Sequence, residues 1–224
     1  MIETFIIGSG NLSNELKKKI ADSKIYSAKD FLKKIRSINN KKKINLIINS
    51  FYSSVKLKKI IAYEAFVHKS SFETAKILDL LSPKIINKII YTSSSSVYGL
   101  KSIKINLKDD NNRDIYAAFK LSTEFLIKNF CEKNNISYVI CRLFNMYGGN
   151  DKFSIIQKLQ NAIKRNQQII IFNNGKSIRD YIHIDDVVKI YDRILVTKID
   201  SALYDIGTGK GVSLIELIKK LNFK

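Results

Sequence analysis

The chain has 224 residues, of which 45% are hydrophobic and 26% are charged. This length and composition suffice for one sizeable hydrophobic core with at most one small additional lobe. The sequence has no run of about 18 apolar residues, so we expect no membrane span. Its N-terminus lacks the basic region and the small-residue cleavage site of a signal peptide, and we therefore expect a cytoplasmic protein.

The chain is strongly basic, with 39 lysine and arginine residues, 20 acidic residues and a net charge of +19. Such a charge is typical of nucleic-acid-binding proteins. The lysines are spread along the chain in short clusters, however, and are not interleaved with aromatic residues as in single-strand-binding proteins. We interpret them as solvated faces that attract anionic substrates in general, and expect no specific nucleic acid as a partner. Cys131 and Cys141 fit neither a disulfide framework nor a metal site, and we predict no bound metal.

The first predicted strand, residues 4–7, runs into a glycine turn and a helix over residues 14–21. This arrangement makes a phosphate site, because free N–H groups and the helix dipole face the turn. The turn follows the dinucleotide fingerprint G-x-G-x-x-G with a serine in the third place, although any tight strand-to-helix turn has a similar sequence. The predicted cofactor-binding residues are Gly8, Gly10, Asn11, Leu12 and Ser13.

The second predicted strand, residues 24–26, bears on the choice between NAD and NADP. Dinucleotide sites usually place an acidic residue at the end of this strand to hold the adenosine ribose. Here the strand ends on Ser27, and the nearest acid, Asp30, is positioned to cap a helix over residues 31–36. Because Lys29 also lies nearby, the sequence leaves NAD and NADP both open.

Further apolar segments follow in an alternating order. They predict strands over residues 44–49, 88–92, 137–141 and 169–172, and helices over residues 56–81, 114–133 and 154–165.

The segment from residue 89 to residue 120 contains the candidate catalytic residues. An apolar run ends in Thr92 and four serines, and such a strand presents its last side chains at the edge where open α/β sheets bind ligands. Tyr116 and Lys120 follow, four residues apart on one helix face. A free phenol has a pKa near ~10, but a neighbouring ammonium and a positive nicotinamide both favour the phenolate. With a serine to orient the substrate oxygen, this set suits proton transfer coupled to hydride transfer.

This segment resembles the active site of the extended short-chain dehydrogenase/reductases, the nucleotide-sugar epimerase/dehydratase family. The resemblance implies a doubly wound parallel α/β sheet, the NAD(P)-binding Rossmann fold, with a small, truncated C-terminal substrate lobe. The family's catalytic hydroxyl lies five residues before the glycine of V-Y-G, which selects Ser94 here, with Ser93, Ser95 and Ser96 as close neighbours. Asn49 stands where the family carries a small-residue loop beside the cofactor.

Two later motifs extend the resemblance. Residues 142–148, RLFNMYG, are similar to the family's R-x-x-N-x-Y-G, which implies that Asn145 contacts the substrate. Residues 175–187, GKSIRDYIHIDDV, are similar to the motif whose arginine pairs with the nucleotide diphosphate, here Arg179, because a planar guanidinium suits that group. Without the resemblance, Arg179 and Asp180 would be interpreted as a surface ion pair. Residues 204–217 match the family's late strand, glycine turn and helix.

The sequence also departs from some relatives. Dehydratase relatives carry an acidic pair after the catalytic hydroxyl, and decarboxylase relatives a glutamate; here Ser95 and Ser96 stand there, which argues against both reactions. Ser95 is instead a candidate substrate contact. Relatives continue for several dozen residues past the match to residues 207–209, so we expect a reduced or open substrate lobe, or one completed by a partner.

We expect residues 1–150 to form the dinucleotide-binding core, and residues 151–224 to combine part of the substrate lobe with late Rossmann elements over 184–206. The predicted activity is that of an NAD(P)-dependent epimerase acting on a nucleotide-activated sugar at C4 through a keto intermediate, in polysaccharide biosynthesis. Two alternatives stay open: an NADPH-dependent 4-keto-sugar-nucleotide reductase, and a shortened, non-catalytic relative that binds a sugar nucleotide or a partner. The family resemblance also suggests a homodimer formed through the Tyr116 helix and the long helix before it.

Overall fold

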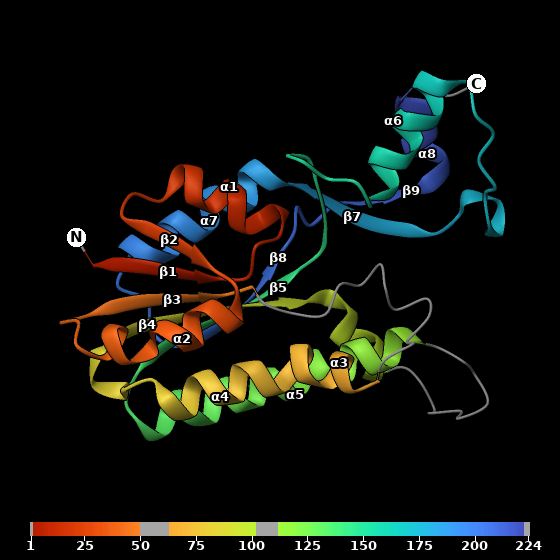
Figure 1. The fold of residues 1–224 in the computed structure, drawn as a ribbon. Helices are drawn as coiled ribbons and strands as arrows, with labels where there is room; N and C mark the ends of the chain where they lie inside the picture. Colours follow the sequence, from red (N-terminus) through yellow and green to blue (C-terminus); the bar gives the residue numbers. More distant parts are fainter. Residues whose placement is uncertain (1, 50–62, 102–111, 222–224) are drawn as a thin grey trace.

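The computed structural model describes residues 2–49, 63–101 and 112–221, and its centre is a six-stranded parallel sheet (Figure 1). The strand order is β2-β1-β3-β4-β5-β8, so the order reverses between β1 and β3. The bounds of the strands are β1 Glu3–Ile7, β2 Ser23–Tyr26, β3 Ile44–Ile48, β4 Ile86–Ser94, β5 Ser137–Leu143 and β8 Ala202–Ile206.

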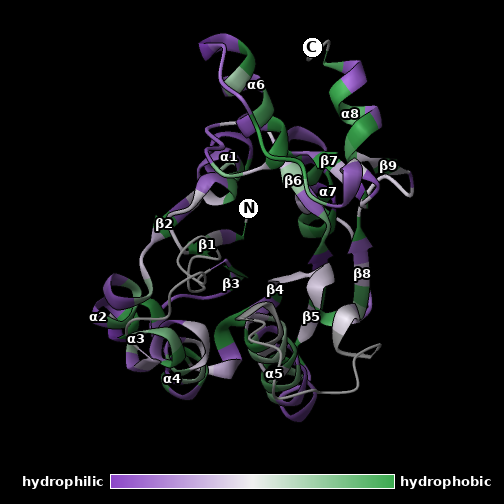
Figure 2. Ribbon diagram, turned by 90° about the vertical axis from the view of Figure 1, so that its right-hand side faces the viewer, coloured by the Kyte–Doolittle hydropathy of each residue, from purple (hydrophilic) through white to green (hydrophobic). Residues whose placement is uncertain are grey.

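Helices cover both faces of this sheet (Figure 1). One face packs against α1 and α7, and the opposite face against α2, α4 and α5. Each of α2, α4 and α5 mixes hydrophobic and hydrophilic residues (Figure 2), as expected of a helix that buries one side on a sheet. The bounds are α1 Asn11–Lys19, α2 Ala28–Asn39, α3 Tyr63–Val67, α4 Glu73–Leu80, α5 Asn112–Lys133 and α7 Ile184–Val196.

The middle strands are buried on both sides, which explains their nearly continuous apolar sequences. Every residue of β3 is buried. Ile6, Ile47 and Ile90 lie level with one another on β1, β3 and β4 and contribute to the core beneath α1 and α7. Phe5 and Tyr91 face the other way, toward the core beneath α2, α4 and α5.

A smaller sheet forms the second part of the molecule. Its strand order is β6-β7-β9, with β6 parallel and β9 antiparallel to β7. Helices α6 and α8 lie side by side next to it (Figure 1) and share a separate cluster that includes Leu159 and Leu217. The bounds are β6 Asn145–Tyr147, β7 Ile178–His183, β9 Gly211–Ser213, α6 Ile155–Arg165 and α8 Leu214–Lys220.

The predicted doubly wound α/β sheet is confirmed, and its five N-terminal strands lie where the sequence predicts them. Part of the predicted helix over residues 56–81 lies outside the described residues. The remainder is helical but contains one wider π-helical turn, His68–Phe72, between α3 and α4. The proposed division at residue 150 stays a prediction, although α7 and β8 return to the large sheet.

Two local predictions are wrong. Residues 169–172 form no strand: β7 already has β6 and β9 as neighbours, and Ile170 and Phe172 are 82% and 80% exposed. Asp30 does not cap the second helix, because α2 begins earlier and the Ser27 hydroxyl accepts the Asp30 N–H at 3.1 Å.

The described residues contain neither a membrane-spanning helix nor a metal-binding cluster. Among them, no helix is long and apolar enough to cross a membrane. The same residues contain no group of three or more histidine, cysteine, aspartate or glutamate side chains arranged to hold a metal ion.

Candidate active site

Ser94, Tyr116 and Lys120 come together where β4 ends against α5. Ser94 is the last residue of β4, and its hydroxyl hydrogen-bonds the Tyr116 side chain. Lys120 lies one helical turn after Tyr116, is 3% exposed and donates from Nζ to the Thr92 carbonyl oxygen at 2.7 Å. The same Nζ lies 5.9 Å from the centre of the Tyr116 ring and 4.9 Å from the centre of the Tyr91 ring. The strand edge and the helix face therefore supply the three predicted catalytic side chains to one place.

Burial controls how these groups ionise. It raises the pKa of Tyr116 to about 12, and the Ser94 hydrogen bond opposes the rise. Burial lowers the pKa of Lys120 to about 7, and the negative charge of Glu124 opposes this fall. Near neutral pH the phenol therefore keeps its proton, while the amine is close to half protonated.

The four consecutive serines have different surroundings. Ser93 is buried and donates to Glu124, and the backbone N–H of Ser96 donates to the Ser94 hydroxyl at 3.2 Å. Ser95 is half-buried, and the buried Ser96 hydroxyl has no hydrogen-bond partner among the described residues. Of these serines, Ser94 is the one whose hydroxyl bonds with Tyr116.

The glycine turn lies at the end of β1, where the strand order of the sheet reverses. Gly8 has φ +110°, which favours glycine, and its N–H donates to the Tyr26 carbonyl at 2.8 Å. Gly10 has an ordinary backbone conformation and stands immediately before α1, where an added Cβ would meet nothing within 4 Å. The N–H groups of the first turn of α1 have no acceptor within the helix. The turn thus combines a strand exit whose backbone conformation favours glycine with an open helix N-terminus.

The side chains around this turn mainly connect elements of the protein. Asn11 donates to the Gly148 carbonyl and accepts the Asn150 N–H, each at 2.9 Å, and so ties α1 to the segment after β6. Asn49 donates to the Ser13 hydroxyl at 3.0 Å and accepts from the Thr92 hydroxyl. The side chain of the remaining predicted residue of the turn, Leu12, is buried in the core.

Asn145 and Arg179 lie on the small sheet. Asn145 donates from Nδ2 to the Asp180 carbonyl at 2.9 Å, and the exposed Arg179 donates to the Ile178 carbonyl at 2.7 Å. The Asp180 carboxylate accepts both the N–H and the hydroxyl of Thr208 and the N–H of Gly209. Asp180 therefore holds the turn after β8, in place of the surface ion pair with Arg179 that these two neighbours would suggest without the family resemblance.

A family model described as the NAD dependent epimerase/dehydratase family matches residues 12–207. The chain belongs to this family.

Among curated relatives, the chain is 29% identical to a dTDP-D-glucose 4,6-dehydratase of Dictyostelium discoideum, over 84% of this chain and 46% of the relative. It is 32% identical to an ADP-L-glycero-D-manno-heptose-6-epimerase of Brachyspira hyodysenteriae, over 70% of this chain and 52% of the relative. The chain thus spans about half the length of the curated relatives that it matches.

Solved epimerase structures share the fold. The UDP-glucose 4-epimerase of Thermotoga maritima, solved with UDP-glucose, superposes with a TM-score of 0.79 at 18% identity, over 99% of this chain and 82% of that one. The UDP-glucuronic acid 4-epimerase of Bacillus cereus, solved with UDP-glucuronic acid and NAD, gives a TM-score of 0.76 at 19% identity, over 100% of this chain and 84% of that one.

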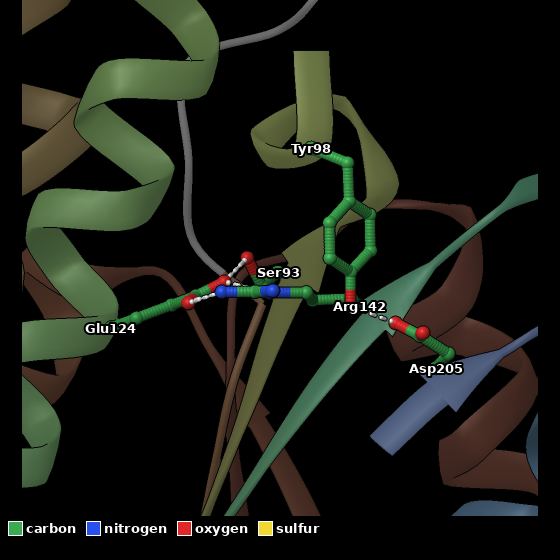
Figure 3. A network of polar contacts seen from close by, with 5 residues as sticks. All are labelled: Ser93, Tyr98, Glu124, Arg142 and Asp205. Carbon is green, nitrogen blue, oxygen red and sulfur yellow. Dashed lines mark hydrogen bonds and ion pairs between the residues drawn. The ribbon is translucent and has the colours of Figure 1, made fainter. Parts of the chain in front are cut away.

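In this member of the epimerase/dehydratase family, a polar network centred on the buried Glu124 supports the site, and sequence reasoning missed it (Figure 3). Glu124 accepts two hydrogen bonds from Arg142 and one from Ser93. The Tyr98 ring lies 4.7 Å from the Arg142 guanidinium carbon, and the Tyr98 hydroxyl donates to Asp205 at 2.7 Å. A signal was present in the sequence: Glu124 follows Lys120 by one turn, and Arg142 opens the R-x-x-N-x-Y-G motif.

Proposed function

We propose that the protein is an NAD(P)-dependent epimerase that inverts C4 of a nucleotide-activated sugar through a keto intermediate. The observation that carries this proposal is the meeting of Ser94, Tyr116 and the buried Lys120 amine at the carboxyl end of the parallel sheet. This is the edge at which open α/β sheets bind ligands. Membership of the family and the fold shared with UDP-sugar 4-epimerases support the same assignment.

The cofactor's pyrophosphate binds at the turn from Gly8 to Ser13. The fit rests on the positive φ of Gly8, the open space beside Gly10 and the unpaired N–H groups at the start of α1. The side chains of Asn11, Ser13 and Asn49 are held by the protein, so the backbone N–H groups make the phosphate contacts. When bound, the nicotinamide supplies the acceptor and donor of hydride.

Tyr116 acts as the acid and base. Its phenolate oxygen takes the proton of the C4 hydroxyl while C4 loses its hydrogen as hydride, which oxidises that carbon to a ketone. Ser94 orients the sugar oxygen in line with Tyr116. The keto sugar then rotates within the site, so that hydride returns to the opposite face of C4. Tyr116 returns the proton to the C4 oxygen, and the configuration at C4 is inverted.

Lys120 makes this proton transfer feasible. The pKa of Tyr116, about 12 in the protein alone, must fall by several units before the phenolate can act near neutral pH. The Lys120 ammonium and the positive charge of an oxidised nicotinamide together favour the phenolate, each unit corresponding to about 1.4 kcal/mol. The phenolate form of Tyr116 is therefore most populated when the oxidised cofactor is bound. Lys120 also lies where it can bind the nicotinamide ribose.

The substrate's nucleotide binds against the small sheet. Arg179 is exposed on β7 and pairs with the diphosphate, and Asn145 and Ser95 contact the substrate nearer the large sheet. Although several relatives are 4,6-dehydratases, Ser95 and Ser96 provide no acid–base pair to drive elimination. This supports epimerisation over dehydration.

One observation favours a second candidate, a reductase that consumes NADPH. No acid ends β2: Ser27 caps α2, and its hydroxyl also donates to the Asp30 carboxylate at 2.7 Å. Lys29 is exposed beside it and suits the 2′-phosphate of NADP.

Incubation with NAD and with UDP- or dTDP-hexoses, followed by proton NMR of the sugars, tests the proposal. The expected result is interconversion of C4 epimers with no net change in absorbance at 340 nm. Stoichiometric oxidation of NADPH by a 4-keto sugar nucleotide would establish the reductase instead. Binding of cofactor and sugar nucleotide without turnover would favour the non-catalytic alternative.

A further inference from the structure

Glu124 connects the helix that carries Tyr116 and Lys120 to two strands of the sheet (Figure 3). Its side chain is 5% exposed and lies one helical turn after Lys120. Its carboxylate accepts from Arg142 Nε at 3.0 Å and Nη2 at 2.6 Å, and from the Ser93 hydroxyl. Ser93 lies next to Ser94 on β4, and Arg142 lies on β5. One carboxylate thus joins α5 to the ends of both strands.

Arg142 is itself held from the other side. The Tyr98 ring lies against its guanidinium, and Tyr98 is anchored through its hydroxyl to Asp205 on β8. The hydrogen bonds with Glu124 raise the pKa of Arg142 further, so this partner stays charged at every pH at which the protein is folded. The bidentate geometry fixes the direction as well as the distance of the carboxylate.

A buried ion pair is not needed to fill this space. Replacing such a pair by apolar side chains of similar volume is often neutral or stabilising, because burying charge is costly. What the pair provides is directional contact between specific atoms of α5, β4 and β5. These three elements also carry or border Ser94, Tyr116 and Lys120.

We propose that Glu124 is a positioning residue that fixes α5 against β4, holds the Lys120 amine in place and favours its protonated form. The inference rests on the proposed function, which gives Lys120 its role. The titratable groups that face Lys120 in the described structure are Tyr91 from β4 and Tyr116 and Glu124 from α5. Of these, Glu124 is the group that opposes the lowering of the Lys120 pKa by burial.

Titration of Lys120 in the full chain tests this inference. Protein labelled with ¹³C at lysine Cε is titrated by NMR without added nucleotide, and the Lys120 signal is identified by its loss in Lys120→Arg. In Glu124→Gln we expect the Lys120 midpoint to fall by about one pH unit, because a nearby opposite charge is removed. The matched control is Glu132→Gln, which removes an exposed carboxylate two turns further along α5 and should leave the midpoint unchanged.

The direction in which the Lys120 midpoint moves in Glu124→Gln distinguishes a positioning role of Glu124 from a role in stabilising the fold alone. If Glu124 only stabilised packing, its loss would admit water and raise the Lys120 midpoint, so an unchanged or higher midpoint contradicts the proposal. Should Glu124→Gln not fold, the double variant Glu124→Gln/Arg142→Met removes both charges and keeps an acceptor for Ser93, and its midpoint should also be lower than that of the wild type. Failure of both variants to fold would overturn the proposal, because the pair would then be needed for the fold itself.

The titration needs no cofactor, so it is independent of the test of the proposed function. A wild-type protein that binds no nucleotide but shows the lowered Lys120 midpoint in Glu124→Gln would refute the epimerase and retain the positioning role. A wild-type protein that binds nucleotide but shows no lowered Lys120 midpoint in Glu124→Gln would retain the epimerase and refute the positioning role.

Discussion

Burial moves the pKa values of Tyr116 and Lys120 in opposite directions, to about 12 and about 7. A phenol beside an amine with these values stays protonated near neutral pH unless a further positive charge is present. At the scale of single residues, the base is therefore coupled to the oxidation state of the bound cofactor. The Ser94 hydrogen bond acts on the same phenol and opposes the rise in its pKa.

Replacing Tyr116 by phenylalanine removes the hydroxyl that we propose transfers the proton and leaves the ring in place. We expect turnover to fall by about 10²- to 10⁴-fold, the usual contribution of a general acid or base. Cofactor affinity and thermal stability should change little, because the substitution removes only the hydroxyl and keeps the ring beside Lys120. Steady-state kinetics check the first expectation and calorimetry the second. Tyr204→Phe, on β8 and 41% exposed, is the control and should retain activity.

The lowered pKa of Lys120 also predicts how stability depends on pH. Between about pH 7 and pH 10 the unfolded chain binds a proton that the folded protein has lost, so the free energy of unfolding should rise with pH in this window. The expected slope is about 1 kcal/mol per pH unit, and it should be absent in Lys120→Met. Above pH 10 the raised pKa of Tyr116 acts in the opposite direction and reduces stability. Urea denaturation of the wild type and of Lys120→Met from pH 6 to pH 10 measures the free energy of unfolding. If the two proteins showed the same dependence on pH, the lowered pKa of Lys120 would be contradicted.

At the scale of elements, the strands and the glycine turn could be predicted because local signals determine them. Apolar runs mark β1, β3, β4 and β5, and Gly8 marks a backbone conformation that glycine favours. Contacts between distant segments leave no such signal. The Glu124–Arg142 pair joins residues 18 positions apart; the motifs beside each residue mark them singly, but not the fact that they meet. The strand predicted over residues 169–172 failed for the same reason, since a β-strand depends on neighbours that its own sequence does not specify.

The two glycines of the turn should respond differently to the same substitution. Gly8→Ala places a side chain at φ +110°, a strain of about 1–3 kcal/mol, and should lower the melting temperature. Gly10→Ala meets no protein atom within 4 Å, so the melting temperature should be retained while the added methyl obstructs the cofactor. Thermal unfolding and NAD titration of both variants provide the measurements. Unchanged NAD affinity in Gly10→Ala would contradict the placement of the pyrophosphate.

At the scale of the whole molecule, the outer side of α5 is an apolar surface. It is formed by Ala118, Leu121, Ser122, Phe125, Leu126 and Asn129, and Phe125 is 62% exposed. The large sheet is covered on both faces, so this surface is available to a second copy of the chain. The substrate site that we propose, between the large sheet and the small one, lies away from this side of α5.

We therefore expect a homodimer formed through α5. Phe125→Glu should convert it to a monomer, because a charge in an apolar interface cannot be compensated. Phe172→Glu, at an 80% exposed position near the small sheet, serves as the control and should remain dimeric. Light scattering after size-exclusion chromatography distinguishes the two states. A wild-type protein that is monomeric at high concentration would contradict this prediction.

The most direct test of the central claim is a calorimetric titration of the full chain with NAD and with NADP. We predict saturable binding of at least one of them with one site per chain, weakened in Gly10→Ala and retained in Tyr116→Phe. A folded wild-type protein that binds neither dinucleotide would contradict the claim that Tyr116 and Lys120 serve proton and hydride transfer.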